Sequence, residues 1–391
     1  IPFEPMAETV CDKVKTVILM GVTAPKIEAA IRGAKNYQEG HPQLLHVETM
    51  EEAVQTADQI TKPGDIVTLS PACASFDKYP NFEEIGKGAV RMKITALLRK
   101  LTAIPGVSGR EAVVSQPLLE LLKEYCPDAA LVQGNIIGTF GKRESGKPHV
   151  LLDAHFDQVG LIVTYIDENG FLKVGNLGGL DLRLFPAQTV TVHGTSDIPG
   201  VVCAMPPHLL AGDADVADIT DILIDTGYSK EELEKIGSLG DMISFDAPFE
   251  ELCGDRICSP ALDDRCGIAA ILYALSQLDA ETLPCSVSVL FSAQEELGER
   301  GAKIAAYTIQ PDIALAVDVS FGRANEEAPE KCGSLGGGAM IGISPSLSAE
   351  VSRDLKNIAE AEQIPWQPEV MSGTTGTNAD QFSVTRGGVK A

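Results

Sequence analysis

The sequence predicts an α/β protein built in two parts, of which the second carries a small β-rich insertion. Three observations indicate this: strands alternate with helices over the first 88 residues, the pattern starts afresh at Met92, and short alternating apolar runs fill residues 160–255. Strands that alternate with helices are typical of βαβ units around a parallel sheet. We therefore expect domains over residues 1–88, over residues 92–159 together with 256–391, and over the insertion at residues 160–255.

The first part begins with an apolar strand predicted at TVILMG (16–21), followed by a helix capped by Thr23. LLHVE predicts a second strand, the periodicity from Met50 to Ala57 predicts another helix, and DIVTLSP (65–71) predicts a third strand. The turn-rich stretch PACASFDKYPNFEEIG then closes this unit. These elements together predict a partial Rossmann-like lobe.

The second part begins with an amphipathic helix and a Pro-Gly loop in MKITALLRKLTAIPGVSGRE, so we place the junction near residues 88–92. Within the insertion, LIVTYID, FLKVGN, QTVTVHG and IGSLGDMISFD alternate apolar and polar residues and are separated by turns. Such short alternating runs predict β-strands with one buried face.

Charge and composition exclude several classes of partner. The chain has 55 acidic against 31 basic residues and a net charge of −24, a balance that repels nucleic acid and anionic membranes. No apolar run approaches the ~18 residues that a membrane span needs. Nine cysteines without a C-x-x-C pair fit a reducing compartment. These features predict a cytoplasmic protein.

Four short stretches gather titratable side chains at the ends of apolar runs: AHFDQVG, PALDDRCG, SAQEELGERGA and AVDVS. Placed together they would supply one imidazole and five carboxylates to a single pocket, which is the ligand set of a two-metal hydrolase. The six candidates are His155, Asp157, Asp263, Glu295, Glu296 and Asp318.

The spacing within these stretches supports a shared pocket. Residues i and i+2 of a strand face the same side, so His155 and Asp157 point together, and Asp157 is placed to accept the second ring N–H of a metal-bound imidazole. An unpaired carboxylate at Asp318, at the end of a buried strand, needs a metal or a cationic partner. The carboxylate-rich shell suits Zn²⁺, Co²⁺ or Mn²⁺ rather than a thiolate-bound structural zinc.

Each stretch taken alone also has a structural explanation. The H-x-D pair fits a buried, hydrogen-bonded histidine beside a loop aspartate. Either Asp263 or Asp264 fits an N-cap at the start of the apolar helix that follows, and the adjacent glutamates fit a solvated acidic turn. The Gly-rich stretch GTTGTNAD (373–380) fits an active-site loop or a simple surface turn.

Residues 1–86, through VILMGVTAPKI and GDIVTLSPACASFDKYPNFEE, resemble the C-terminal domain of UDP-N-acetylmuramoylalanine–D-glutamate ligase. The resemblance implies that Ser75 and Phe82 match residues that hold D-glutamate in that family. No G-x-x-x-x-G-K-[ST] phosphate loop occurs in the chain, which argues against ligase activity. A binding module related to these ligases remains one alternative function.

Residues 92–391 resemble the M42 family of metallo-aminopeptidases, through an ordered series that includes IPGVSGRE, LLDAHFDQVG, DTGYSKEELE, ALDDRCG, QEELGERGA and GTNAD. The resemblance implies an α/β zinc-peptidase domain of the phosphorylase/hydrolase-like type, two divalent ions, peptide substrates and a homo-oligomer, by family a dodecamer, whose contacts the insertion builds. It makes Asp263 the bridging ligand and leaves Glu295 free as the general base. The catalytic residues are then Glu295 and Asp157, and the metal ligands are His155, Asp263, Glu296 and Asp318.

The family continues past the residues matching the end of this chain into a loop with one more histidine ligand, whereas all six histidines here lie at or before His208. The resemblance therefore implies a weak or inactive aminopeptidase with about one tightly bound metal per chain. Two further alternatives are an inactive or assembly-only fragment and a deacylase acting on N-acyl amino acids.

Overall fold

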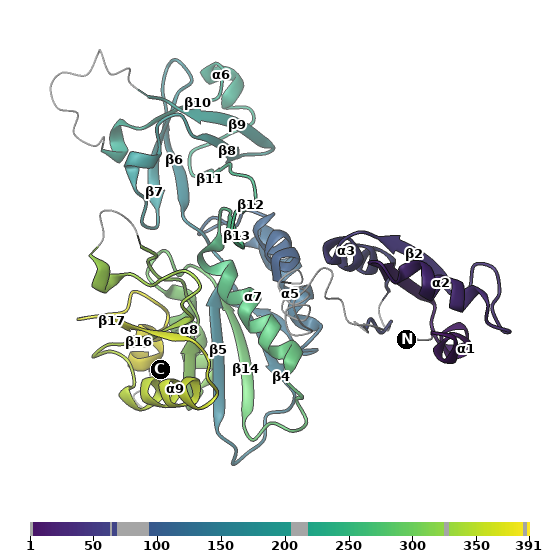
Figure 1. Cartoon of the computed structure of the whole chain (residues 1–391). Helices are drawn as coiled ribbons and strands as arrows, with labels where there is room; N and C mark the ends of the chain where they lie inside the picture. The colour runs from purple at the N-terminus through teal and green to yellow at the C-terminus, as the bar shows by residue number, and fades with distance from the viewer. Residues whose placement is uncertain (1–2, 63–64, 69–93, 205–217, 324–327, 386–388) are drawn as a thin grey trace. The chain divides into compact units, whose positions relative to one another are not determined.

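The computed structural model describes residues 3–62, 65–68, 94–204, 218–323, 328–385 and 389–391. The chain divides into two compact units, Ile1–Leu97 and Leu98–Ala391, and it mixes α-helices with β-strands throughout (Figure 1). No helix among the described residues is both long enough and apolar enough to cross a membrane.

The first unit is a small α/β lobe around two parallel strands. Strands β1 (Thr16–Met20) and β2 (Gln43–Val47) pair in parallel, and helix α2 (Ala24–Arg32) makes the connection between them that a parallel pair requires. Helices α1 (Glu4–Lys13) and α3 (Met50–Ile60) complete the lobe. Its own apolar cluster includes Leu19 of β1 together with Ile27 and Ile31 of α2.

The prediction of a third strand at residues 65–71 is wrong over residues 65–68, the part of this segment that the structure describes. Residues 65–68 form no strand, and Ile66 is 90% exposed. An apolar β-branched run forms a strand only when a neighbour pairs with it, and no partner meets this segment in the described part of the lobe. The remainder of the run, the junction at residues 88–92, and both Ser75 and Phe82 lie outside the described residues.

The second unit is built on a five-stranded sheet of order β15-β5-β14-β4-β3. Strands β5 (His149–His155), β14 (Ser286–Ser292) and β15 (Ile313–Ala316) run parallel, while β4 (Asn135–Phe140) and β3 (Ala130–Val132) are antiparallel. A helical segment at residues 94–102 precedes it in the chain. Helices α5 (Ala112–Lys123), α7 (Leu262–Gln277), α8 (Arg300–Ile309) and α10 (Ala379–Thr385) surround the sheet.

Between β5 and α7 the chain forms a closed six-stranded barrel of order β10-β7-β6-β11-β8-β9. Its apolar interior is a separate cluster that includes Leu161, Val190 and Ile243, each fully buried. The strands are β6 (Gly160–Ile166), β7 (Leu172–Leu177), β8 (Thr189–His193), β9 (Asp197–Val202), β10 (Leu223–Asp225) and β11 (Met242–Phe245).

Short elements complete the second unit. The barrel carries 3-10 turns η1 (Leu182–Leu184) and η3 (Ile219–Asp221) and helix α6 (Lys230–Leu233), and a hairpin of β12 (Glu250–Leu252) and β13 (Arg256–Cys258) follows it. Turn η4 (Pro329–Lys331), the parallel pair β16 (Ala339–Ile343) and β17 (Trp366–Val370), and helix α9 (Ala349–Ala361) lie between β15 and α10 in the chain.

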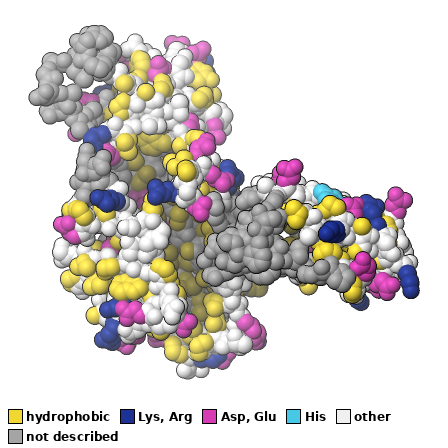
Figure 2. Space-filling view, in the orientation of Figure 1, with side chains coloured by type: hydrophobic (Ala, Val, Ile, Leu, Met, Phe, Trp, Pro, Cys, Tyr) yellow, Lys and Arg dark blue, Asp and Glu magenta, His cyan; other side chains and the backbone are white. Residues whose placement is uncertain are grey.

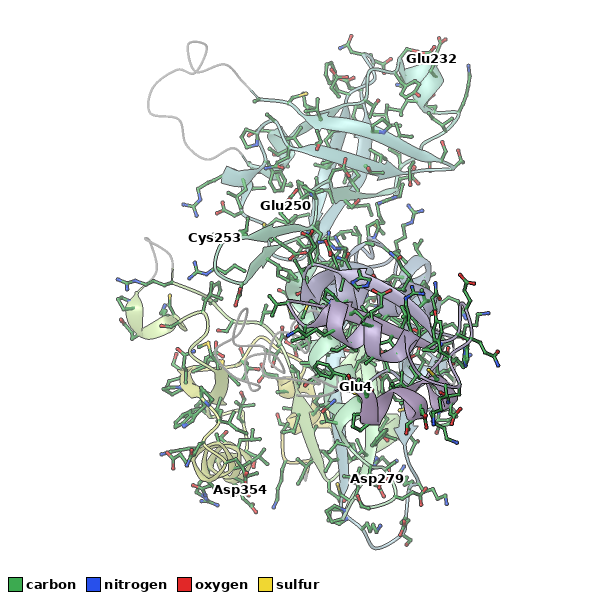
Figure 3. The ribbon with its side chains drawn as sticks, turned by 45° about the vertical axis from the view of Figure 1, so that its right-hand side comes forward. Glu4, Glu232, Glu250, Cys253, Asp279 and Asp354 are labelled. Atoms are coloured by element: carbon green, nitrogen blue, oxygen red, sulfur yellow. The ribbon has the colours of Figure 1, made fainter. Side chains whose placement is uncertain are left out.

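Exposed acidic side chains come from several elements of both units. The labelled acidic side chains in Figure 3, including Glu4 of α1, Glu232 of α6 and Asp354 of α9, come from different elements and point outward. The face shown in Figure 2 has its acidic side chains scattered, with hydrophobic side chains gathered near the β16–β17 pair.

Candidate metal centre

The candidate residues converge at the carboxyl edge of the parallel strands. His155 is the last residue of β5 and pairs in register with Ser292, the last residue of β14. Glu295 and Glu296 follow β14, and Asp318 follows β15 two residues after Ala316. Parallel strands end at the same edge of a sheet, which is where α/β proteins bind ligands.

Three of the predicted ligands approach one another directly. Nε2 of His155 lies 2.8 Å from Oδ1 of Asp263 and 3.9 Å from Oδ1 of Asp318. One ligand atom from each of the three residues falls within 4.8 Å of the others. The imidazole is almost completely buried, while the carboxylate of Asp263 is half exposed, so the group opens towards solvent on one side.

The second ring nitrogen of His155 fixes the orientation of the imidazole. Nδ1 lies 3.0 Å from the backbone carbonyl of Asp157 and 3.5 Å from Oδ1 of its carboxylate. Asp157 is the expected partner of this ring nitrogen, and its backbone carbonyl lies nearer than the carboxylate that was expected to accept the N–H. With Nδ1 directed at Asp157, Nε2 is the ring atom that faces Asp263 and Asp318 and that a metal ion would bind in place of a proton.

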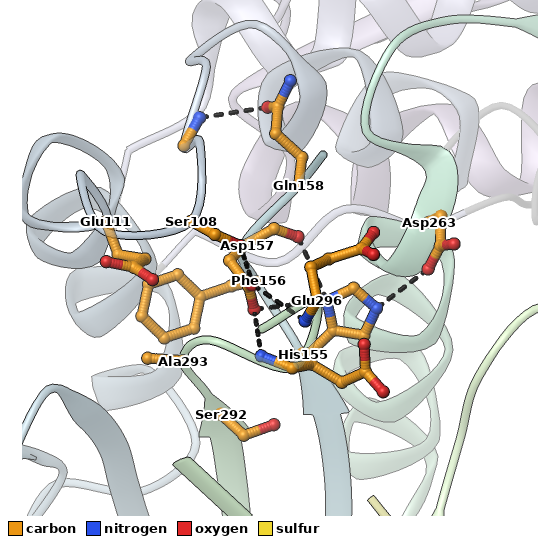
Figure 4. A network of polar contacts seen from close by, with 12 residues as sticks. Ser108, Glu111, His155, Phe156, Asp157, Gln158, Asp263, Ser292, Ala293 and Glu296 are labelled. Carbon is orange, nitrogen blue, oxygen red and sulfur yellow. Dashed lines mark hydrogen bonds and ion pairs between the residues drawn. The ribbon is translucent and has the colours of Figure 1, made fainter. Parts of the chain in front are cut away.

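The carboxylate of Asp157 organises the loop that carries the glutamates (Figure 4). It accepts the backbone N–H groups of Glu295 at 3.0 Å and Glu296 at 3.2 Å, and the hydroxyl of Ser108 donates to it. Burial alone would raise the pKa of Asp157, but the contacts with His155, Ser108 and Glu295 lower it below its ordinary value. A buried, ionised Asp157 thus joins β5 to the segment after β14.

The structure separates the two aspartates that open α7. Both have non-helical backbone angles, but Asp264 is fully buried and accepts the N–H of Gly267 at 2.9 Å, as an N-cap residue does. Asp263 instead contacts His155. Arg265 is also fully buried and donates to the carbonyl of Phe156, at 3.0 Å from Nε and 2.7 Å from Nη2, which ties the start of α7 to the loop after His155.

The acidic groups need a cation to ionise together. Burial raises the pKa of Glu295 to about 8, that of Glu296 to about 7 and that of Asp318 to about 6, and neighbouring carboxylates add to each shift. One imidazole nitrogen and the carboxylate oxygens of Asp263 and Asp318, within 4.8 Å of one another, are donors that Zn²⁺, Co²⁺ or Mn²⁺ accept. The residues therefore fit a divalent metal.

Sequence reasoning missed three contributors to this site. Ser108 lies in the IPGVSGRE stretch but carried no assigned role, and Gln158 accepts the N–H of Gly106 through Oε1 at 3.0 Å. Gly178, with φ of +83°, brings the backbone after β7 so close that a Cβ would lie 2.9 Å from Oε2 of Glu296. A double glycine inside an alternating β segment was the available signal.

Comparison with known proteins gives a consistent picture for the second unit. The model of the M42 glutamyl aminopeptidase family matches residues 134–391. The lysyl aminopeptidase of Pyrococcus furiosus is 31% identical over 301 residues, which cover 75% of this chain and 86% of that protein. Over the first residues, a UDP-N-acetylmuramoylalanine–D-glutamate ligase of Clostridium botulinum is 54% identical over 83 residues, covering 21% of this chain and 18% of the ligase.

Solved structures that resemble this chain are also aminopeptidases or peptidases. An aminopeptidase from the archaeon Desulfurococcus kamchatkensis has a TM-score of 0.71 and 34% identity, covering 76% of this chain and 85% of its own. The TET1 peptidase of Pyrococcus horikoshii, which can assemble into a tetrahedron or a large octahedral shell, has a TM-score of 0.65 and 32% identity, covering 73% of this chain and 87% of its own.

Proposed function

Because the chain belongs to the M42 glutamyl aminopeptidase family, which makes it a hydrolase of peptide bonds, we propose that it is a two-metal aminopeptidase that releases N-terminal residues from peptides. His155, Asp263, Glu296 and Asp318 would hold the ions, with Asp263 serving as a ligand to both. The observation that carries this proposal is the convergence of His155, Asp263 and Asp318 at the carboxyl edge of the sheet.

Two divalent ions held there would supply Lewis acidity to a peptide carbonyl and would lower the pKa of a water molecule. Glu295 would act as the general base, accepting a proton from the attacking water and returning it to the leaving amine, a role that requires a carboxylate near the ligands but not itself a ligand. The N–H contact to Asp157 holds Glu295 in place, and its partly buried position keeps competing solvent away. The contact of Nδ1 with Asp157 fixes the orientation of the His155 ring and leaves Nε2 as the atom that an ion would bind.

A pair of substrates and one control variant test this assignment. Protein stripped of metal by chelation should release single N-terminal residues from unblocked peptides only after Zn²⁺, Co²⁺ or Mn²⁺ is returned, as followed by mass spectrometry. The His155→Ala variant should not regain peptidase activity at the same metal concentration. Hydrolysis of N-acetylated amino acids in place of unblocked peptides would identify a deacylase, and hydrolysis of either that survives chelation would reject the metal mechanism.

We also propose that the chain forms a homo-oligomer, with twelve copies by family resemblance, and that the barrel segment within residues 160–255 contributes to its contacts. The assembly of the TET1 peptidase, with which this chain shares 32% identity, supports this. Light scattering coupled to size-exclusion chromatography should give a mass several times the 41.4 kDa of one chain. A monomeric mass at micromolar concentration would contradict it.

A further inference from the structure

The Gly-rich loop at residues 373–380 contributes a buried side chain that the proposed mechanism does not use. Asn378 is 2% exposed, and its amide Nδ2 lies 2.8 Å from Oδ2 of Asp153 and 2.7 Å from Oγ of Ser292. Both partners are fully buried. A surface turn would leave such an amide in water, so the loop reaches the interior of the sheet at Asn378.

The two partners of Asn378 lie on β5 and β14, the strands that lead into the metal centre. Asp153 precedes His155 by two residues on β5, so the two side chains share one face of the strand. Ser292 pairs in register with His155 and stands three residues before Glu295. The backbone carbonyl of Asp153 accepts the N–H of Val317 at 2.8 Å, immediately before Asp318. Asn378 therefore contacts β5 and β14 directly and reaches the end of β15 through Asp153.

The loop that presents Asn378 is itself held firmly. Oδ2 of Asp380 accepts the backbone N–H groups of Thr375 at 2.7 Å and Gly376 at 3.0 Å. Phe382 of α10 is fully buried in the apolar cluster that contains Leu151 of β5. An anchored loop can restrain the strands it touches, because its own position does not follow theirs.

We propose that Asn378 is a positioning residue for the metal centre: its amide holds Asp153 and Ser292, and so sets the spacing of the strand ends that carry His155, Glu296 and Asp318. This inference rests on the proposed function, since it assigns Asn378 to the same metal ligands. Residues that orient the metal ligands without binding the metal themselves typically change metal affinity by about 10–100-fold when they are removed. An amide is needed because it can donate to a carboxylate and a hydroxyl at once.

Three substitutions separate positioning from general stability. Asn378→Ala removes both hydrogen bonds, and Asn378→Asp places a second carboxylate against Asp153. The double variant Asp153→Asn with Asn378→Asp restores one amide–carboxylate hydrogen bond with donor and acceptor exchanged. Asn169→Asp, at an exposed position in the turn between β6 and β7, adds the same charge away from the site.

The measurements are the dissociation constant for Zn²⁺ by chelator competition, the unfolding temperature of the metal-free protein, and kcat and KM. We expect both single variants to bind Zn²⁺ about 10–100-fold more weakly. The double variant should recover most of this loss, and Asn169→Asp should match the wild type. The effect should fall on kcat more than on KM, because Asn378 does not contact substrate.

Three results would contradict the positioning role or the function on which it rests. Wild-type Zn²⁺ affinity in both single variants overturns it, even where the metal-free protein unfolds at a lower temperature, because Asn378 would then serve stability alone. If the single variants do not fold, a folded double variant without recovered affinity overturns it. A wild type that binds no more Zn²⁺ than His155→Ala instead overturns the proposed function, and the positioning role falls with it.

Discussion

Glu295 and Glu296 are neighbours in the chain, yet the proposal gives them different tasks that single substitutions separate. Glu295→Gln should keep the metal and the fold while turnover falls about 10²–10⁴-fold, because a general base is lost but no ligand is. Glu296→Gln should instead weaken metal binding. Metal content by mass spectrometry and kcat on an unblocked peptide check both.

Glu281→Gln, in the loop before β14, is the matched control for the loss of one glutamate and should behave as the wild type. Full turnover in Glu295→Gln with its metal retained would assign the proton transfer to another group. Loss of metal in Glu295→Gln, with metal retained in Glu296→Gln, would exchange the two roles.

At the residue scale the sequence indicated which side chains come together, as His155, Asp263 and Asp318 do, better than it indicated which atoms they contact. A titratable residue at the end of an apolar run, as at His155 and Asp318, is visible because it is costly to bury alone. The sequence could not show which atom of Asp157 lies nearest to Nδ1 of His155. The distance from Nδ1 is 3.0 Å to the backbone carbonyl and 3.5 Å to the carboxylate, a difference of only half an ångström. Likewise, backbone angles and not residue types decide that Asp264 caps α7 while Asp263 faces His155.

In the turn after β7, the backbone geometry requires glycine at Gly178 but not at Gly179. A Cβ at Gly178 would lie 2.9 Å from Oε2 of Glu296 and 2.7 Å from Val159, at a φ of +83°. Gly178→Ala should therefore cost on the order of 1–2 kcal/mol in backbone strain and also displace Glu296, weakening metal affinity. Gly179→Ala meets nothing within 4 Å and should change neither.

Metal titration and thermal unfolding of the two glycine variants check this difference. Equal metal affinity in Gly178→Ala and Gly179→Ala would mean that the turn moves aside, and that the barrel segment does not limit the position of Glu296.

The carboxyl edge of the sheet should make the stability of the metal-free protein depend on pH. Burial raises the pKa of Asp153 and of Glu296 to about 7, of Glu295 to about 8 and of Asp318 to about 6. A carboxyl group with a raised folded pKa stabilises the fold below its unfolded pKa, and this contribution is lost as pH rises through the folded value. The unfolding temperature of the metal-free protein should therefore fall from about pH 5 to pH 8.

Added metal should reverse this trend, because binding displaces those protons and strengthens as pH rises. Scanning calorimetry with and without Zn²⁺ at pH 5.5, 7.0 and 8.5 measures both effects, and Glu295→Gln should reduce the slope of the metal-free protein. A metal-free protein that is more stable at pH 8.5 than at pH 5.5 would contradict the burial of these groups.

At the element scale, periodicity identified β1, β2 and α2 to within about two residues. It failed at residues 65–68, where Ile66 and Val67 have high β-propensity but no partner strand among the described residues. Alternation within the insertion indicated strands but could not give the order β10-β7-β6-β11-β8-β9, because strand order depends on contacts distant in sequence.

For the whole molecule, the two units have separate apolar cores. One cluster draws on residues between Phe3 and Leu44, and two clusters of the second unit draw on residues beyond 136. Units with their own cores unfold independently, so a shortened chain of residues 92–391 should keep its unfolding temperature and its peptidase activity. Calorimetry and a peptide assay compare the two chains, and a drop of more than a few degrees would show that residues 1–91 support the second unit.

The central claim is that one group of side chains at the end of β5, β14 and β15 binds the catalytic metal. Anomalous diffraction at the zinc absorption edge, from crystals loaded with Zn²⁺, tests it most directly. The account predicts an anomalous peak about 2.0–2.2 Å from both Nε2 of His155 and a carboxylate oxygen of Asp263. Peptidase activity in crystals whose zinc peaks all lie away from His155 would contradict it.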